Sequence, residues 1–217
     1  MQLMGDSVPH VSMCKEALFD PLDDCYNIVM PYYTGGDIFD RLQQASMTED
    51  EIRPLFKNIM QALRGMHDKD ICHHDLSIEN IMLNDGQAYI IDFGMAVRVP
   101  VKVARRCLIK PQGNFGKLPY MSPEVYKSNV PFSGEAVDVW SAGTILFCMV
   151  TRQASYGRPQ ESDPQFQWMT TDMAQLMHSW NLDLSPEVVH LMANMLQTNP
   201  SLRLTIDEVL HHPWMMM

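Results

Sequence analysis

Two short apolar runs joined by a tight turn constrain this chain more than any other feature. Residues 81–83 and 88–91 are apolar, and residues 84–86 between them read Asn-Asp-Gly, which is a strong turn signal. The pattern predicts a β-hairpin. Because a hairpin folds back on itself, the residue before its first strand and the residue after its second, Asn80 and Asp92, are expected at the same end.

The residues at that end of the hairpin suit a magnesium ion. An amide oxygen and a carboxylate are hard ligands of the kind that Mg²⁺ takes together with a bound phosphate. Asp75 lies five residues before Asn80, on the loop that leaves a long predicted helix, and brings a second carboxylate to the same point. We therefore expect Asn80 and Asp92 to hold the metal, with Asp75 beside them.

Most of the remaining chain is predicted to be helical. Thr48 and Glu51 have the spacing of a capping box, and apolar residues then recur on one face as far as Met66. Residues 137–150 are apolar on nearly all sides, which predicts a buried helix. Shorter elements are predicted as a strand at residues 27–30, a helix near residues 37–42, a helix beginning at Ser185-Pro186, and a last helix capped by Thr205 and Glu208 that ends at Pro213.

Taken together, these features resemble the protein kinase family. Residues 73–80, with the sequence HHDLSIEN, look like its catalytic loop, and Asp92-Phe93-Gly94 looks like its metal-binding triplet. The other matching motifs are Ser122-Pro123-Glu124 at the end of the activation segment, Asp138 in D-V-W-S-x-G, and Arg203 in N-P-x-x-R. The resemblance runs from the first residues to Trp214.

The resemblance implies an α+β, protein-kinase-like fold with two lobes. The mainly helical large lobe would be complete, and the small β lobe would be reduced to a remnant. Residues 1–33 would form this remnant and the hinge, residues 34–217 the large catalytic lobe, and residues 92–124 the activation segment. The two remaining strands of the small lobe would expose an unpaired edge.

The family's mechanism can be transferred to individual residues. Asp75 would accept or orient the proton of the substrate hydroxyl, and Asn80 and Asp92 would hold Mg²⁺ on the ATP phosphates. Asp138 would anchor the catalytic loop. Further roles that the resemblance implies are Met30 as the gatekeeper, Pro31 and Tyr33 as the hinge backbone, Asp37 and Met82 at the nucleotide, His73 packed against Phe93, and Arg203 paired with Glu124.

The chain lacks two elements that the family requires. No G-x-G-x-x-G sequence is present, and the only lysine before Met30, Lys15, is not in a V-A-I-K context. We interpret the chain as truncated at its N-terminus and expect weak or no activity from it, because each missing charge-stabilising group costs about 10²–10³ in rate. The alternative is a pseudokinase or scaffold that binds partners through the helical lobe.

A second departure concerns a lysine. Serine/threonine kinases have a lysine at the position of Ser77 and a threonine at the position of Lys117; here the two residue types are exchanged. We hypothesise that Lys117 reaches across and supplies the cation for the transferring phosphate, with Ser77 as its hydroxyl partner. The competing interpretation is two independent losses in a decaying kinase.

A third departure concerns regulation. The family arginine that binds a phosphate on the activation segment is His74 here, and no Ser, Thr or Tyr lies between Asp92 and Lys117. The sequence therefore predicts that phosphorylation of this segment does not activate the protein.

Composition limits the partners. The formal charge of −10 argues against nucleic acid, and the longest apolar run, residues 144–150, is too short to span a membrane. Five scattered cysteines without a C-x-x-C pair indicate reduced thiols in the cytoplasm or nucleus. We expect a monomeric serine/threonine kinase, similar to the calcium/calmodulin-dependent group, that uses ATP and Mg²⁺ on a protein substrate. Asp37 and Glu79 resemble positions that contact basic substrate residues. The alternative is that both simply belong to a solvated face. Cys148 occupies a third position, where an acidic residue often contributes to the same contact.

Overall fold

Two long helices at the centre of the molecule organise the fold. The computed structural model describes residues 8–102, 105–110, 116–127 and 129–217. Helix α2 (Glu49–His67) begins with the predicted capping box of Thr48 and Glu51, and helix α4 (Gly134–Thr151) packs beside it. Nearly all of α4 is buried, as its uniformly apolar sequence predicts.

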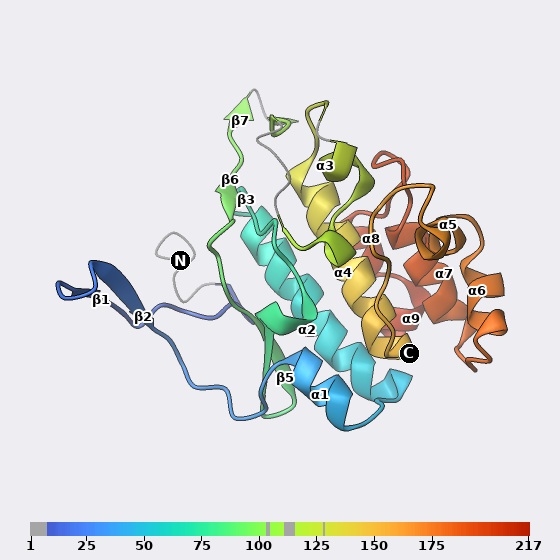
Figure 1. The fold of residues 1–217 in the computed structure, drawn as a ribbon, viewed down its shortest axis with the longest axis horizontal. Coiled ribbons are helices and arrows are strands. Elements are labelled where there is room, and N and C mark those ends of the chain that lie inside the picture. The colour runs from blue at the N-terminus through green and yellow to red at the C-terminus, as the bar shows by residue number, and fades with distance from the viewer. Residues whose placement is uncertain (1–7, 103–104, 111–115, 128) are drawn as a thin grey trace.

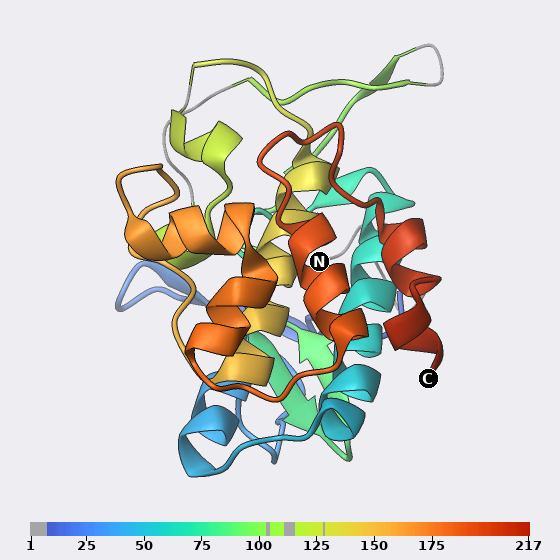
Figure 2. The same ribbon diagram turned by 90° about the vertical axis from the view of Figure 1, so that its right-hand side faces the viewer.

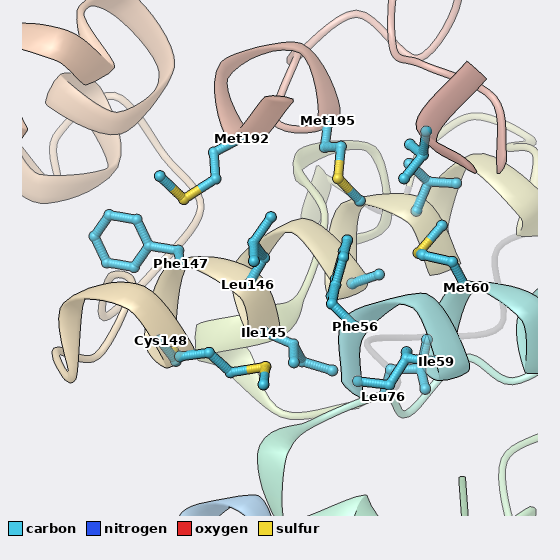
Figure 3. Close-up of a cluster of buried hydrophobic side chains, with 14 of the residues drawn as sticks. Phe56, Ile59, Met60, Leu76, Ile145, Leu146, Phe147, Cys148, Met192 and Met195 are labelled. Atoms are coloured by element: carbon cyan, nitrogen blue, oxygen red, sulfur yellow. The ribbon is translucent and has the colours of Figure 1, made fainter. Parts of the chain in front are cut away.

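A third helix completes the hydrophobic core. Figure 3 shows Phe56 and Met60 of α2 facing the side chains of α4, with Met192 and Met195 of helix α7 (Pro186–Met195) covering them from the other side. All four of these residues are fully buried. Burying a side chain of this size stabilises the folded state by about 1.5–3 kcal/mol, so this three-helix contact holds the large helical body together.

Shorter helices surround this core, and Figure 2 shows those of the C-terminal half on one side of it. Their bounds are α1 (Ile38–Gln44), α3 (Pro123–Lys127), α5 (Pro164–Thr171), α6 (Met173–Ser179), α8 (Ile206–Leu210) and α9 (Pro213–Met216), with 3-10 turns at Ile78–Asn80 and Leu118–Tyr120. The described helices include none that is both long enough and apolar enough to cross a bilayer.

The described strands form four antiparallel pairs. Strand β4 (Ile81–Asn84) pairs with β5 (Gln87–Ile90) in the hairpin that the sequence predicts. The other pairs are β1 (Glu16–Asp20) with β2 (Cys25–Val29), β3 (Ile71–Cys72) with β6 (Val97–Arg98), and β7 (Val101–Lys102) with β8 (Arg105–Arg106). The helical body and the small sheets give the α+β character that we expected.

The β1–β2 hairpin projects away from the helical body (Figure 1). Four of the five residues of β1 and all five of β2 are exposed. Large apolar side chains are among them, including Phe19, Tyr26 and Ile28. The strand predicted at residues 27–30 corresponds to β2, and its edge is unpaired in the described chain, as expected.

The prediction for the C-terminus was wrong in one respect. The helix that Thr205 and Glu208 cap ends at Leu210, and Pro213 begins a further helix, α9, instead of ending one. Proline suits the first turn of a helix because the N–H that it lacks would have no partner there. His212 caps α9 by accepting a hydrogen bond from the N–H of Trp214.

Candidate active site

A buried carboxylate fixes the loop that follows β3. Asp138 on α4 is fully buried, and its two oxygens accept hydrogen bonds from the backbone N–H groups of His73 and His74 at 2.8 and 2.9 Å. His67 at the end of α2 places Nε2 2.8 Å from the same carboxylate. Burial alone would raise the pKa of Asp138, but its hydrogen bond and proximity to His67 outweigh burial and lower that pKa. The ionised Asp138 thus holds the loop in one conformation.

Backbone conformation also marks this loop and the one after β5. His74 and Asp92 have φ angles of 66° and 58°, in the left-handed region that residues other than glycine adopt rarely. Such conformations persist only where surrounding contacts enforce them, and they gather at functional sites. For His74, the bond from its N–H to Asp138 provides that enforcement.

The hairpin brings Asn80 and Asp92 together. Ile81 pairs with Ile90 at the open end of β4 and β5, and the N–H of Ile91 donates to the carbonyl of Asn80 at 3.0 Å. Asp92 is the next residue along the chain. It is exposed, and its Oδ1 accepts the N–H of Gly94 at 3.1 Å.

Asp75 joins this pair. The side-chain Nδ2 of Asn80 donates to the carbonyl oxygen of Asp75 at 2.7 Å. Burial raises the pKa of Asp75; the positive charge of Lys117 and the proximity of His73 oppose that shift, and the negative charge of Asp92 adds to it. The three residues on which the magnesium prediction depends therefore lie around one point.

Lys117 closes the other side of Asp75. Its Nζ donates to Ser77 Oγ at 2.8 Å and to Glu79 Oε2 at 3.1 Å, and its positive charge acts on the carboxylate of Asp75. Gly116, at φ 88°, allows this approach, because a Cβ there would lie only 3.0 Å from the carbonyl oxygen of His74. The structure thus brings the exchanged residues, Lys117 and Ser77, into direct contact.

Two further expected contacts are present. The rings of His73 and Phe93 meet edge to face with centroids 5.3 Å apart. Arg203 binds Glu124 through two hydrogen bonds of 2.7 and 3.1 Å, and its guanidinium lies over the ring of Trp140. This buried ion pair ties the end of the activation segment to the C-terminal helices.

On the nucleotide side, the structure brings some of the expected residues together. Asp37 caps α1 by accepting the N–H of Asp40 and forms a β-bridge with Met82. Tyr33 is buried, and the centroid of its ring lies 5.1 Å from the centroid of the Tyr89 ring. The remaining two residues, Met30 and Pro31, lie on the connection between β2 and α1, and Met30 is 37% exposed.

Sequence reasoning missed two partners in the site. His67 was not identified as the side chain that binds Asp138, although its position at the end of an amphipathic helix, six residues before His73, is a signal. Glu79 was expected either to face basic substrate residues or to be solvated; in the structure it binds Lys117. That contact joins residues 38 positions apart, so local patterns did not indicate it.

Comparison with known proteins identifies the family of this chain. The sequence matches the protein kinase domain over residues 3–215, and the chain belongs to that family. It is 32% identical to the serine/threonine-protein kinase grp of Drosophila melanogaster over 86% of this chain and 36% of grp. Calcium-dependent protein kinase 24 of Arabidopsis thaliana is also 32% identical, over 95% of this chain and 34% of its own length. The chain is 30% identical to the rice serine/threonine-protein kinase SAPK2 (Oryza sativa subsp. indica) and covers 60% of it. It therefore spans roughly a third to three fifths of these relatives.

Proposed function

We propose that this chain carries the phosphoryl-transfer centre of a serine/threonine protein kinase, with ATP and a protein hydroxyl as substrates. The observation that carries the proposal is the convergence of Asp75, Asn80 and Asp92, linked by the bond from Asn80 to Asp75 and by the pairing of Asn80 with Ile91. Family membership and the serine/threonine kinase names of its relatives support it.

The donor set fits magnesium. Because Nδ2 of Asn80 is engaged with the carbonyl of Asp75, the amide presents its oxygen as a ligand. Asp92 adds an exposed carboxylate, so the two side chains offer the oxygen ligands that Mg²⁺ prefers. When bound, the ion neutralises negative charge on the phosphate oxygens.

Asp75 orients the nucleophile in this proposal. Its carboxylate accepts the proton of the substrate hydroxyl, and burial, which raises its pKa, makes it a better proton acceptor than an exposed aspartate. Two hydrogen bonds hold the backbone of Asp75, since its N–H donates to Nδ1 of His73 at 3.3 Å and its carbonyl accepts from Asn80. Positioning and charge stabilisation supply most of the catalysis in phosphoryl transfer.

Lys117 supplies the cation in this proposal. Its Nζ is held beside Asp75 by Ser77, which is buried, and by Glu79. Ser77 and Glu79 use two of the three N–H donors of this ammonium group, so the third can give a phosphate oxygen a charge-assisted hydrogen bond. This geometry favours a functional exchange of Ser77 and Lys117 over two unrelated losses.

We further propose that the adenine side is formed by Met30, Pro31, Tyr33, Asp37 and Met82. The bridge between Asp37 and Met82 supports this assignment, because it places both at the connection between the hinge and the hairpin. We assign residues 1–33 to the small lobe and hinge and residues 34–217 to the large lobe. A monomeric protein acting on proteins in the cytoplasm or nucleus is consistent with these assignments.

Replacing Asp75 by Asn tests the proposed function. We expect Asp75→Asn to lower phosphoryl transfer by the full-length protein at least about 10²-fold, because the proton acceptor is lost. Asp85→Asn is the matched control, since Asp85 lies in the exposed hairpin turn away from the site. Equal turnover by Asp75→Asn and the unaltered protein would contradict the proposal.

A scaffold without catalysis is the second candidate. Two observations favour it: no Gly-rich loop occurs in these 217 residues, and the β1–β2 hairpin exposes apolar side chains suited to a partner. Thermal unfolding with and without Mg-ATP separates the two. A protein that neither gains stability from Mg-ATP nor transfers phosphate fits the scaffold.

A further inference from the structure

A cavity lies directly beside the proposed site. It has a volume of about 660 Å³, is open to solvent on one side, and is lined by α1, the C-terminal end of α4 and the turn at Leu118–Tyr120. Glu79 and Lys117 form part of its wall. A polypeptide substrate that presents its hydroxyl group to Asp75 can therefore place a neighbouring side chain in this cavity.

The inner wall of the cavity is uncharged. Leu42, Ile78, Tyr120 and Cys148 are all buried there. Burial raises the pKa of the Cys148 thiol to about 12, so it carries no charge near neutral pH. The wall therefore offers apolar contact and no anionic group at the position of Cys148.

The charges around the cavity leave a positive excess. Glu79 is paired with Lys117 at 3.1 Å, so these two charges largely cancel. The third charged residue of the wall is Arg152, which is exposed. Within the described part of the chain, its Nε donates to the carbonyl of Leu42 at 3.2 Å, and the guanidinium has further N–H groups to donate.

From this arrangement we propose that the cavity is a subsite for an acidic side chain of the protein substrate, with Arg152 as the group that selects it. The proposal rests on the proposed function and names the substrate class for the same site. A carboxylate fits the planar guanidinium well, since the two can share parallel hydrogen bonds.

A basic side chain is disfavoured at the same place. It would face Arg152, and the one acid of the wall, Glu79, already holds Lys117. Like charges across an interface suppress the wrong partner. The subsite therefore differs from the basic-residue contact that Glu79 suggested in the sequence, because Lys117 occupies that carboxylate.

Peptide binding tests the subsite without requiring turnover. Fluorescence anisotropy is measured with serine-centred peptides that carry Glu, Leu or Arg at each flanking position in turn, using the full-length protein. At one position we expect Glu to bind about fivefold more tightly than Leu, the factor that corresponds to a partly exposed ion pair, and Arg to bind more weakly than Leu. A preference for Arg at every position, or for Leu over Glu, overturns the proposal.

Variants of Arg152 identify the selecting group. Arg152→Gln should remove the preference for Glu over Leu, and Arg152→Glu should favour Arg instead. Arg158→Glu, which makes the same charge change outside the cavity, should leave the preference unaltered. A preference for Glu that survives Arg152→Gln overturns the assignment. Thermal unfolding shows whether each variant is folded. If Arg152→Glu does not fold, the test rests on the milder variant Arg152→Gln.

The peptide-binding test of the subsite gives a result that is independent of the test of phosphoryl transfer. Asp75→Asn removes the proton acceptor and leaves the cavity intact, since Asp75 is not part of its wall. A protein that transfers no phosphate yet selects acidic peptides through Arg152 refutes the proposed function and keeps the subsite. A protein that transfers phosphate but does not select acidic peptides refutes the subsite and keeps the proposed function.

Discussion

The contact of Lys117 with Ser77 is the basis of our proposal that the site keeps its positive charge although the two residue types are exchanged. The ammonium group reaches the catalytic loop from the activation segment, and the hydroxyl lies on the loop itself. Both groups stay in contact, so the loop retains a cation next to Asp75. The arrangement depends on Gly116, whose left-handed backbone lets the lysine approach.

Replacing Lys117 by Met tests this account. We expect Lys117→Met to lower turnover of the full-length protein about 10²–10³-fold, the usual cost of losing a preorganised charge-stabilising group. Single-turnover phosphate transfer is the measurement, and Lys127→Met, on the exposed end of α3, is the control. The double variant Ser77→Lys with Lys117→Thr should recover part of the loss. Full activity of Lys117→Met would contradict the assignment.

The activation segment carries a prediction at the scale of an element. No hydroxyl side chain lies between Asp92 and Lys117, and His74 replaces the arginine that would receive a phosphate. The ring of His74 instead packs against the ring of Phe132, with the two centroids 5.9 Å apart, and its Nε2 is buried. Part of this segment, residues 103–104 and 111–115, lies outside the described residues.

We therefore expect phosphatase treatment of the full-length protein to leave its turnover unchanged within about twofold, because the stretch between Asp92 and Lys117 has no phosphate acceptor and the arginine that would bind a phosphate is replaced by His74. Activity is measured before and after treatment, with complete dephosphorylation checked by mass spectrometry. A drop of tenfold or more would show that a phosphate elsewhere orders the site and would refute the prediction.

The end of the segment is held by a different device, the pair of Arg203 and Glu124. Both side chains are buried, so removing one leaves the other charge without compensation. We expect Arg203→Leu to lower the free energy of unfolding by about 3–5 kcal/mol, measured by urea titration. Asp50→Asn, which breaks the exposed pair with Arg53, should cost less than about 1 kcal/mol. A small loss for Arg203→Leu would mean that the buried pair does not hold the segment.

Elements with local signals could be predicted from the sequence. The capping boxes at Thr48 and Thr205, the Asn-Asp-Gly turn at residues 84–86 and the uniformly apolar α4 each depend on neighbours in the chain, and each was confirmed. Helices α3, α5 and α6 were not predicted. They are five to eight residues long, and helices of this length are stabilised mainly by tertiary packing.

The contacts of the candidate site likewise divide into those that could be predicted from the sequence and those that could not. The hairpin placed Asn80 beside Asp92 by turn geometry alone, and the contact of Lys117 with Ser77 followed from the resemblance. The binding of Glu79 to Lys117 and the cavity with Arg152 at its edge join segments that are far apart in the sequence. Such contacts depend on how α1, α4 and the activation segment pack, which no local pattern specifies.

At the scale of the whole molecule, stability is concentrated in the helical body. The core of α2, α4 and α7 is closed around its own side chains, while the β1–β2 hairpin contributes almost no buried surface. The site lies on the body, because Asp138 anchors its loop directly to α4. The geometry of Asp75, Asn80 and Lys117 is thus held by the most stable part of the described chain.

The same body should respond to acid through three histidines, of which His212 is buried and His10 and His74 are half-buried. Desolvation lowers the pKa of His10, His74 and His212 below the usual value near 6.5. For His74 the nearby Asp138 opposes this shift, and the other histidines around it, His67 and His73, reinforce it. Below pH 6.5 the unfolded chain binds protons that the folded chain does not, so stability is complete above that pH and declines as the pH falls through this range.

Urea unfolding between pH 8 and pH 5 measures this effect. We expect the free energy of unfolding to be constant from pH 8 to about pH 7 and to decrease from there toward pH 5. His74→Phe removes one of the titrating groups and fills the space beside Phe132, so its decrease should be shallower. The comparison is made relative to each protein's own value at pH 8, which separates titration from any change in packing. A free energy of unfolding that rises on acidification, or an unchanged slope in His74→Phe, would show that these imidazoles do not set the acid response.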